Sequence, residues 1–190
     1  MKIDFFLYAY YGFSRCRAVF YRLITGKNFK SIGRSPKIFG VRSMRIGKNF
    51  SMGDDCWLHA INKYKGLEYF PSLIIGANVA FSDAVHVSCI TEIRIGSGTL
   101  IGSSVYIGDH SHGPTNLSST DRKISPALRP LTEAATILIG DNVWIGDGAR
   151  ILAGSVIPDG SIIGANAVVN SKFTEAGIIV GIPASMKKRF

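Results

Sequence analysis

The sequence is poor in cysteine, in acidic residues and in long apolar runs, and each shortage excludes a class of protein. Three cysteines, Cys16, Cys56 and Cys89, form an odd, scattered set without a disulfide framework or metal-ligand spacing. We therefore expect a cytoplasmic protein of a reducing compartment. Acidic residues number 13 against 22 lysines and arginines, and the net charge of +9 favours anionic ligands. No nucleic-acid motif accompanies this charge, and we expect no nucleic-acid partner.

The most apolar and aromatic run stands at the start of the chain, in MKIDFFLYAYYGF. It is shorter than the roughly 20 residues that a membrane-spanning helix needs. Asp4, and the lack of a small-residue cleavage site after the run, argue against a signal peptide. Within residues 1–30, Asp4 is the single acid among several lysines and arginines. Such a segment either packs on the fold as a cap or rests on a membrane surface, and both interpretations stay open.

Glycine is abundant, with 21 residues, and its positions belong to a repeat of six. Aliphatic residues recur at every sixth position near the C-terminus, namely Ile139, Ile145, Ile151, Ile157, Ile163 and Val169. Four places after these positions stand Val143, Ala149, Ser155, Ser161 and Ala167, which are small or β-branched. The aliphatic pattern continues upstream at Ile46, Met52, Leu58, Ile75, Phe81, Val87, Ile95, Ile101 and Ile107. So regular a spacing predicts a repeat architecture.

A period of six fits neither the 3.6 residues of a helical turn nor the alternation of an isolated strand. It fits a solenoid in which each hexapeptide is one short strand plus a turn, and three hexapeptides close a triangular coil. The aliphatic residue then points inward and stacks on its counterparts in neighbouring coils, which buries a continuous core. The small residue lies at the corner, and glycine occurs where the backbone turns tightly.

These repeats, with VWIG, IGA and GIPA near the end of the chain, resemble the hexapeptide-repeat acyltransferases. Within this family, the repeats and motifs resemble the maltose and galactoside O-acetyltransferases and the O-acetyltransferases of surface polysaccharides. The resemblance covers about residues 32–190 and implies an all-β, left-handed parallel β-helix that assembles as a homotrimer. We expect a helical or membrane-proximal extension at 1–30 and the β-helix at 31–172. A C-terminal cap with a short helix and a basic tail should occupy 173–190.

The period of six is interrupted twice. Residues 59–74 break it with a probable excursion, and a larger break of 32 residues separates Ile107 from Ile139. Residues 109–136, within the second break, are rich in proline, serine, threonine and asparagine, which predicts a loop. Loops of this length inside a compact domain are usually functional or disordered. In the resembled family a loop at this point reaches the neighbouring subunit and walls the active site, so we expect the site here.

Asp109, His110 and His112 are the candidate catalytic residues. Acetyl transfer to a hydroxyl needs a general base, and a neutral imidazole can accept the proton near neutral pH. The resemblance places the catalytic histidine five residues after a core aliphatic, which selects His112 after Ile107. His110 is the second candidate, or a helper that binds substrate. Asp109 can orient either imidazole.

Two other interpretations of the histidine pair stay open. The two histidines can be ordinary polar residues of a solvent-exposed loop, without a role in catalysis. It can also join His86 in a zinc site like that of the γ-class carbonic anhydrases, which share the fold and use three histidines from two subunits. The spacing of His110 and His112 differs from that class, and the C-terminal motifs match acyltransferases, so we expect no metal. His59 and His86 otherwise receive no role.

Acetyl-CoA is the co-substrate that the resemblance implies, bound in the groove between adjacent subunits. When the family's contacts with acetyl-CoA are carried over residue by residue, they correspond to Trp144, Gly146, Asp147, Ala165, Asn170, Lys172 and Lys188. Asn170 and Ser171 stand where the family has a Thr-Lys pair, and Lys172, one place further on, would substitute for that lysine. Lys188 lies in a basic tail that can also be merely solvated. Trp144 can alternatively fill a core or anchor a subunit interface. Arg129, in the RPL segment, either contacts an acidic sugar or braces the loop.

The sequence therefore predicts an acetyl-CoA-dependent O-acetyltransferase. Its acceptor would be a sugar hydroxyl of a bacterial surface polysaccharide (O-antigen, capsule or exopolysaccharide) or of its precursor. The expected mechanism is direct attack in a ternary complex, because no cysteine or serine is placed as a covalent nucleophile. The alternatives are an N-acetyltransferase for an amino sugar or antibiotic, a γ-carbonic-anhydrase-like metal enzyme, and a β-helix without catalytic activity.

Overall fold

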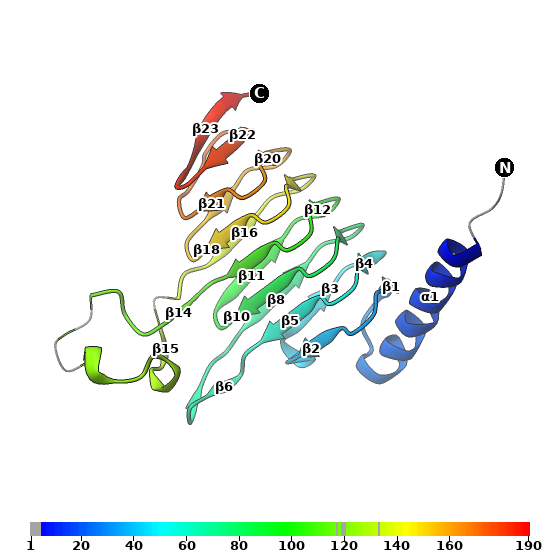
Figure 1. Cartoon of the computed structure of the whole chain (residues 1–190), viewed down its shortest axis with the longest axis horizontal. Coiled ribbons are helices and arrows are strands. Elements are labelled where there is room, and N and C mark those ends of the chain that lie inside the picture. Colours follow the sequence, from blue (N-terminus) through cyan, green and yellow to red (C-terminus); the bar gives the residue numbers. More distant parts are fainter. Residues whose placement is uncertain (1–4, 117, 119–120, 133) are drawn as a thin grey trace.

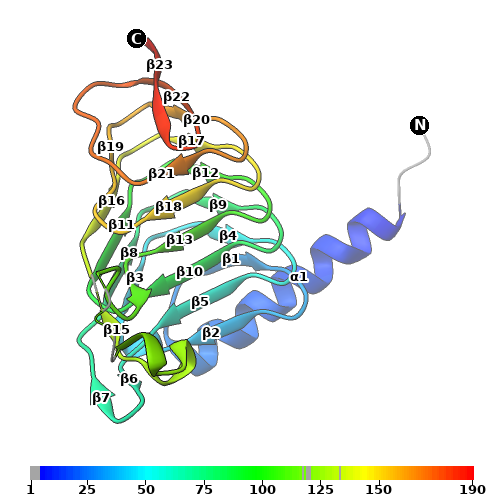
Figure 2. The ribbon, with the colours of Figure 1, turned by 60° about the vertical axis from the view of Figure 1, so that its left-hand side comes forward.

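The computed structural model describes residues 5–116, 118, 121–132 and 134–190, and it shows a coil of short strands with one helix at its N-terminal end (Figure 1). Equivalent strands of successive turns lie side by side and form three parallel sheets, which we name A, B and C (Figure 2). The coil therefore has three faces. This is the arrangement that a period of six predicts.

The three sheets contain the following strands. Sheet A consists of β1 (Phe29–Ile32), β4 (Phe50–Met52), β9 (Ala80–Phe81), β12 (Leu100–Ile101), β17 (Trp144–Ile145), β20 (Ile162–Ile163), β22 (Gly177–Gly181) and β23 (Ala184–Arg189). Sheet B consists of β2 (Lys37–Phe39), β5 (Trp57–Ala60), β10 (His86–Cys89), β13 (Tyr106–Gly108), β18 (Arg150–Leu152) and β21 (Val168–Val169). Sheet C consists of β3 (Met44–Ile46), which follows the short 3₁₀ turn η1 (Val41–Ser43), β8 (Ser72–Ile75), β11 (Glu92–Ile95), β16 (Ile137–Ile139) and β19 (Val156–Ile157).

The register of the strands stacks the predicted core positions on one another. Ile101 pairs with Ile145, and Ile145 pairs in turn with Ile163, so one aliphatic column runs through three coils. The corner positions are buried as predicted, and they are Val143, Ala149, Ser155, Ser161 and Ala167. Their small size matters because each lies where the chain turns inside the prism. The inward and corner positions of the repeat are thus confirmed.

At two of the three corners one device recurs in several coils, in which a side chain accepts a backbone N–H from the preceding coil. At the corner between sheets A and B, Asp83 Oδ1 accepts the N–H of Asp54 at 2.7 Å, and Asp147 Oδ1 accepts that of Ser103 at 2.8 Å. At the corner between sheets C and A the donor–acceptor pairs are Ala77 to Ser97, Ser97 to Asp141 and Asp141 to Asp159. These bonds satisfy amides that the turning backbone leaves free.

The same turns need residues with left-handed backbone conformation. Asn78 and Asn142 take φ values of 56° and 54° at the corner between sheets C and A, and Asn166 takes 56° at the corner between A and B. Asparagine and glycine adopt this region at the least cost among the residues. The recurrence of asparagine and glycine in the sequence therefore reflects the geometry of the turns.

The third corner, between sheets B and C, is where the chain leaves the coil. The first departure is a hairpin of β6 (Lys63–Tyr64) and β7 (Leu67–Glu68). It is narrower than the predicted excursion at 59–74, because β5 and β8 are regular strands of the coil. The second departure is the long loop, which contains β14 (Ser111–His112), η2 (Asp121–Lys123), η3 (Pro126–Leu128) and β15 (Leu131–Thr132). Both project from the same side of the coil (Figure 2).

The C-terminal segment corrects one expectation, because it forms a hairpin and not a short helix. Strand β22 continues sheet A in parallel with β20, and β23 folds back antiparallel to β22. Ile178, Ile179 and Val180 are β-branched residues, which favour a strand. Gly177 is required here, since a Cβ at this position would meet the carbonyl oxygen of Lys188. The hairpin covers the last turn of the coil.

The helix α1 (Phe5–Thr25) packs along β1 and covers the N-terminal end of the coil. Its Ala18 belongs to the buried core, and Tyr21 meets Phe29 edge-to-face with ring centroids 6.4 Å apart. Arg17 Nε donates to the carbonyl oxygen of Ile32 at 2.9 Å. Within the described residues no helix is long and apolar enough to cross a membrane.

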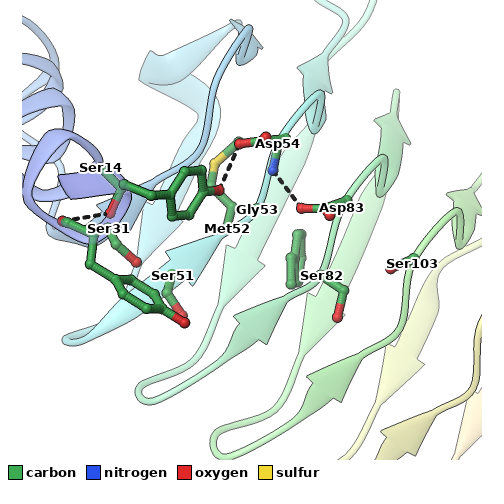
Figure 3. Close-up of a pocket in the computed structure, with 12 residues that line it drawn as sticks. Ser14, Ser31, Ser51, Met52, Gly53, Asp54, Ser82, Asp83 and Ser103 are labelled. Carbon is green, nitrogen blue, oxygen red and sulfur yellow. Dashed lines mark hydrogen bonds between the residues drawn. The ribbon is translucent and has the colours of Figure 1, made fainter. Parts of the chain in front are cut away.

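A second attachment of α1 lies at the corner between sheets A and B. The hydroxyl of Tyr10 donates to Asp54 Oδ1 at 2.7 Å (Figure 3). Arg34 forms an ion pair with the same carboxylate. Burial alone would raise the pKa of Asp54, but hydrogen bonds from the Arg34 backbone, the Tyr10 hydroxyl and the Arg34 side chain lower it. Burial and the bond to Asp54 raise the pKa of Tyr10 to about 12. The helix is therefore tied to the coil by polar as well as apolar contacts.

Candidate active site

All four histidines of the chain line one pocket of about 250 Å³ on the outer face of sheet B. Strands β5, β10 and β13 form its floor, while the β6–β7 hairpin and the long loop form its walls. The lining residues are Trp57, His59, Ile61, Tyr64, His86, Ser88, Tyr106, His110, His112 and Leu131. We name this cavity the histidine pocket. It lies where the sequence predicts the site, at the junction of coil and loop.

The floor of the histidine pocket is an aromatic row set by strand register. Trp57 pairs with His86, and His86 pairs with Tyr106, in successive coils. The rings of Trp57 and His86 are stacked, with centroids 4.3 Å apart and an angle of 2° between their planes. Tyr106 meets His86 edge-on at 5.3 Å. The row is therefore a continuous aromatic surface.

Sequence reasoning missed this row, although a signal for it was present. Trp57, His86 and Tyr106 each stand one position before a core aliphatic of the repeat, which are Leu58, Val87 and Ile107. Neighbouring residues of a strand point to opposite faces, so all three side chains must point outward from the same face. His86, which the sequence analysis weighed only as a zinc ligand, thus lines the histidine pocket.

Asp109 is fully buried beneath the histidine pocket. Its carboxylate accepts the backbone N–H of Ile90 at 2.9 Å and that of Thr91 at 2.8 Å. Asp109 Oδ1 also lies 2.9 Å from Nδ1 of His110. Because an ionised carboxylate only accepts hydrogen bonds, Nδ1 of His110 carries the proton, and Nε2 is left free to accept one. This is the tautomer that a general base needs.

His110 and His112 differ in how they are held. The side chain of His110 is only 5% exposed and contacts Asp109, whereas His112 is exposed. Nδ1 of His112 lies 3.5 Å from the hydroxyl of Tyr64, and that hydroxyl donates to the carbonyl oxygen of Ala127 at 2.9 Å. His112 therefore stands at the rim without a carboxylate partner. Of the two, His110 is the histidine with a carboxylate partner, while the choice of His112 as the base stays a prediction.

The other two histidines are held in the neutral form. Burial lowers the pKa of His86, and electrostatic interactions with His59, His110 and Lys37 lower it further. Burial, followed by the charge of His110, lowers the pKa of His59. Both imidazoles are therefore uncharged at neutral pH and act as hydrogen-bonding groups. Within the described residues, Nε2 of His86 and Nε1 of Trp57 are buried without a hydrogen-bond partner.

The two buried cysteines, Cys56 and Cys89, are poor candidates for a nucleophile. Burial raises the pKa of Cys56 to about 11, and burial with the charge of Asp109 raises that of Cys89 further. Both thiols stay protonated at neutral pH, and a thiol is a weak nucleophile compared with its thiolate. In the part of the chain that is described, no group of three or more histidine, cysteine or acidic residues is placed to hold a metal ion.

The residues predicted to bind acetyl-CoA lie elsewhere on the coil. Trp144 is 53% exposed on sheet A, on the outer face of β17. Gly146 and Asp147 follow it at the corner between A and B, next to exposed Ala165, and a Cβ on Gly146 would lie 2.7 Å from the Ala165 nitrogen. Asn170, Lys172 and Lys188 are exposed near the C-terminal end of the coil. None of these seven described residues lines the histidine pocket.

Arg129 serves the loop itself. Its Nε donates to the carbonyl oxygen of Ile124 at 3.0 Å, and its side chain lies against Gly113, where an added Cβ would be 2.8 Å from the arginine Cδ. Gly113 takes a φ of 87°, which also favours glycine at this position. These contacts support the bracing role, and Arg129 is not among the side chains of the histidine pocket.

Comparison with known proteins identifies the family. The family model of the bacterial transferase hexapeptide, with six repeats, matches residues 136–171. The chain is 35% identical over 150 residues to the putative lipopolysaccharide biosynthesis O-acetyl transferase WbbJ of Escherichia coli K12, an alignment that covers 78% of this chain and 72% of WbbJ. The chain belongs to the bacterial hexapeptide-repeat transferases. The expected family and the expected enzyme class, an acetyltransferase, are confirmed.

Other hexapeptide-repeat enzymes are similar over smaller parts or at lower identity. A chloramphenicol acetyltransferase of Morganella morganii is 34% identical over 112 residues, and the alignment spans 53% of each chain. A galactoside acetyltransferase solved with coenzyme A is 26% identical, with a TM-score of 0.53, over 74% of this chain and 65% of that one. AntD, an N-acyltransferase of Bacillus cereus, reaches a TM-score of 0.66 at 18% identity over 86% and 80% of the chains, a likeness of fold alone.

Proposed function

We propose that the protein transfers the acetyl group of acetyl-CoA to a sugar hydroxyl of a bacterial surface polysaccharide or of its precursor. The observation that carries the proposal is the Asp109–His110 pair at the floor of the histidine pocket. The similarity to WbbJ supports a polysaccharide acceptor, because WbbJ is described as a putative lipopolysaccharide biosynthesis O-acetyl transferase. The coenzyme A bound to galactoside acetyltransferase supports acetyl-CoA as the donor.

His110 acts in this proposal as the general base. Acetyl-CoA supplies an acyl thioester, whose carbonyl carbon is the electrophile. Nε2 of His110 removes the proton of the acceptor hydroxyl as its oxygen attacks, and Asp109 stabilises the imidazolium that results. His110 then returns the proton to the departing sulfur. His112, at the rim, is proposed to contact the acceptor.

The aromatic row is proposed as the platform for the acceptor. A sugar ring has apolar C–H faces that lie well on aromatic side chains, and Trp57 with Tyr106 offers such a surface. The sugar also has hydroxyls, and the unpartnered Nε2 of His86 and Nε1 of Trp57 can bond to them. Buried polar groups without partners in a pocket are the ones that a ligand is best placed to satisfy.

The donor is proposed to reach this pocket from a neighbouring subunit. Trp144 lies on sheet A, and the histidine pocket lies on sheet B, so the two face different directions in one protomer. A homotrimer of left-handed β-helices would bring sheet A of one protomer against sheet B of the next. The exposed Lys172 and Lys188 would then be available to the phosphates of acetyl-CoA. Light scattering on the purified protein tests the trimer.

An acetylation assay with several acceptors tests the proposed function. The purified protein would be supplied with acetyl-CoA and with de-O-acetylated polysaccharide, an amino-sugar nucleotide or chloramphenicol, and the products analysed by mass spectrometry. We expect an acetyl ester on the polysaccharide that mild alkali removes, and no ester in the His110→Ala variant. An alkali-stable amide on the amino sugar, or turnover of chloramphenicol alone, would replace the proposal with one of its rivals.

A further inference from the structure

The outward face of α1 is strongly apolar. The exposed apolar side chains of the helix are Tyr8, Tyr11, Phe13, Val19, Phe20, Leu23 and Ile24, and Leu23 is 80% exposed. Phe13, Phe20 and Ile24 are separated by seven and four residues, which places them on one side of a helix. Ser14 and Ala18 lie on a different side of the helix and are buried against the coil. The helix therefore has two apolar sides, and only one of them is covered.

Cationic side chains border this apolar face. Helix α1 contains no aspartate or glutamate, and its exposed Arg15 and Arg22 lie seven residues apart on one flank. Arg22 lines a pocket of about 290 Å³ together with Lys30 and Lys48, and the other lining residues are Asn28, Phe29 and Asn49. Arg15 and Lys30 line the adjoining pocket of about 260 Å³. No described carboxylate lines either pocket.

The charge decides between the possible occupants of this face. A second copy of the chain would bring Arg15 and Arg22 against the same cations of its partner, which opposes association. An anionic bilayer instead presents phosphates to the cations and acyl chains to the apolar side chains. The amide of Asn28 adds hydrogen-bond donors to the cationic pocket, whereas that of Asn49 donates to Asn78 Oδ1. A surface of lipid phosphates thus matches both the apolar and the charged part of the face.

We propose that α1 docks the protein on an anionic lipid bilayer. The helix lies in the plane of the interface, with Phe20 and Leu23 among the acyl chains and with Arg22, Lys30 and Lys48 at the phosphates. The coil and the histidine pocket stay in water, because α1 covers only the N-terminal end of the coil (Figure 1). This docking is independent of the acceptor and would hold for any reaction of the histidine pocket.

Cys16 provides a reporter in the middle of the apolar face. It is exposed, whereas Cys56 and Cys89 are buried, so a thiol-reactive, polarity-sensitive fluorophore labels Cys16 selectively in the folded protein. The labelled protein would be titrated with phosphatidylcholine vesicles and with vesicles that also contain phosphatidylglycerol. We expect a blue shift with the anionic vesicles, quenching by brominated acyl chains, and weaker binding at high salt.

Variants separate the two parts of the face, and unlabelled protein would be sedimented with the same vesicles. Arg22→Gln and Lys48→Gln should each weaken binding about fivefold, which corresponds to about 1 kcal/mol for one basic residue near an anionic surface. Phe20→Ser with Leu23→Ser should weaken it more than about tenfold through lost apolar burial. The matched control is Leu128→Ser with Lys123→Gln, two exposed residues of the loop on the opposite side of the coil.

Three results would overturn the proposal. The first is wild-type protein that does not bind anionic vesicles. The second is binding that the loop control weakens as much as the helix variants do. The third is a change of oligomeric state in Phe20→Ser with Leu23→Ser, measured by light scattering without lipid, which would assign the face to a second copy of the chain. Circular dichroism of each variant verifies that the helix and coil are folded.

Discussion

Asp147 and Asp109 each stand at a corner of the coil, where the carboxylate accepts backbone N–H groups that the turn leaves without a partner, but the surroundings of the two corners differ. Both carboxylates accept backbone N–H groups of the preceding coil. Asp147 is exposed to solvent, and its bond to Ser103 closes the turn. Asp109 is buried beneath two excursions and holds an imidazole as well. A structural element of the repeat has thus become part of a site, because the chain departs from the coil at that corner.

The β6–β7 hairpin segment and the long loop are also joined to each other by hydrogen bonds. The hydroxyl of Tyr69, at the end of the hairpin segment, accepts the N–H of Leu131 at 3.0 Å. Tyr64, in the hairpin, bonds to Ala127 in the long loop. The walls of the histidine pocket are therefore fixed relative to each other. A rigid pocket around His110 is what proximity and orientation in catalysis demand.

The largest expected effect separates the two histidines of the irregular corner. His110→Ala should lower kcat by about 10²–10⁴, the usual contribution of a general base. His112→Ala should lower it by less than about tenfold, because His112 lacks a carboxylate partner. Steady-state kinetics on both variants, with melting temperatures as the control for folding, make the comparison. A greater loss in His112→Ala would return the role of base to that residue.

Replacement of the carboxylates compares the two corners directly. Asp109→Asn keeps an oxygen for the backbone amides, but its NH₂ group would donate to Nδ1 of His110 and leave the proton on Nε2, the wrong tautomer for a base. We expect a loss of activity of at least about a hundredfold. Asp147→Asn should leave the kcat of the enzyme unchanged, because the asparagine oxygen can still accept the N–H of Ser103. Equal activity of the two variants would show that Asp109 serves only the turn.

Substitution of Trp57 on sheet B and of Trp144 on sheet A compares the outer faces of the two sheets. Trp57→Ala should raise the KM for the acceptor about fivefold, since a lost aromatic contact is worth roughly 1 kcal/mol. Trp144→Ala should instead raise the KM for acetyl-CoA, if sheet A of a neighbour carries the donor. Measuring both constants in both variants gives a crossed comparison. The proposed division of the faces fails when both variants change the same constant.

The smallest expected effect concerns pH. Because the pKa of His86 is lowered in the folded protein, the unfolded chain binds more protons below its ordinary pKa of 6.5. The free energy of unfolding should therefore fall as the pH drops below about 6.5. Urea denaturation at pH 7.5 and pH 5.5 measures this fall, and His86→Gln should reduce it. A fall of the same size in His86→Gln would mean that other groups cause it.

Much of the architecture was predictable because local spacing determines it. The aliphatic period of six defines the inward column, and the register of the strands follows from it, as the pairing of Ile101 with Ile145 shows. The hairpin of β22 and β23 was mistaken for a helix, since a GIPA motif and a basic tail carry no period that distinguishes the two. The aromatic row of Trp57, His86 and Tyr106 was overlooked because the outward positions of the repeat do not carry one recurring residue type.

The sequence by itself determined the coil, because each hexapeptide must bury one aliphatic residue and turn at one small residue. It also predicted a candidate site where the period breaks. Only the tertiary structure decided that His110 contacts Asp109, and that four histidines distant in the chain meet in one pocket. The reason is physical, since the contacts of an imidazole depend on which strands stack beside it and on how two irregular segments fold over them.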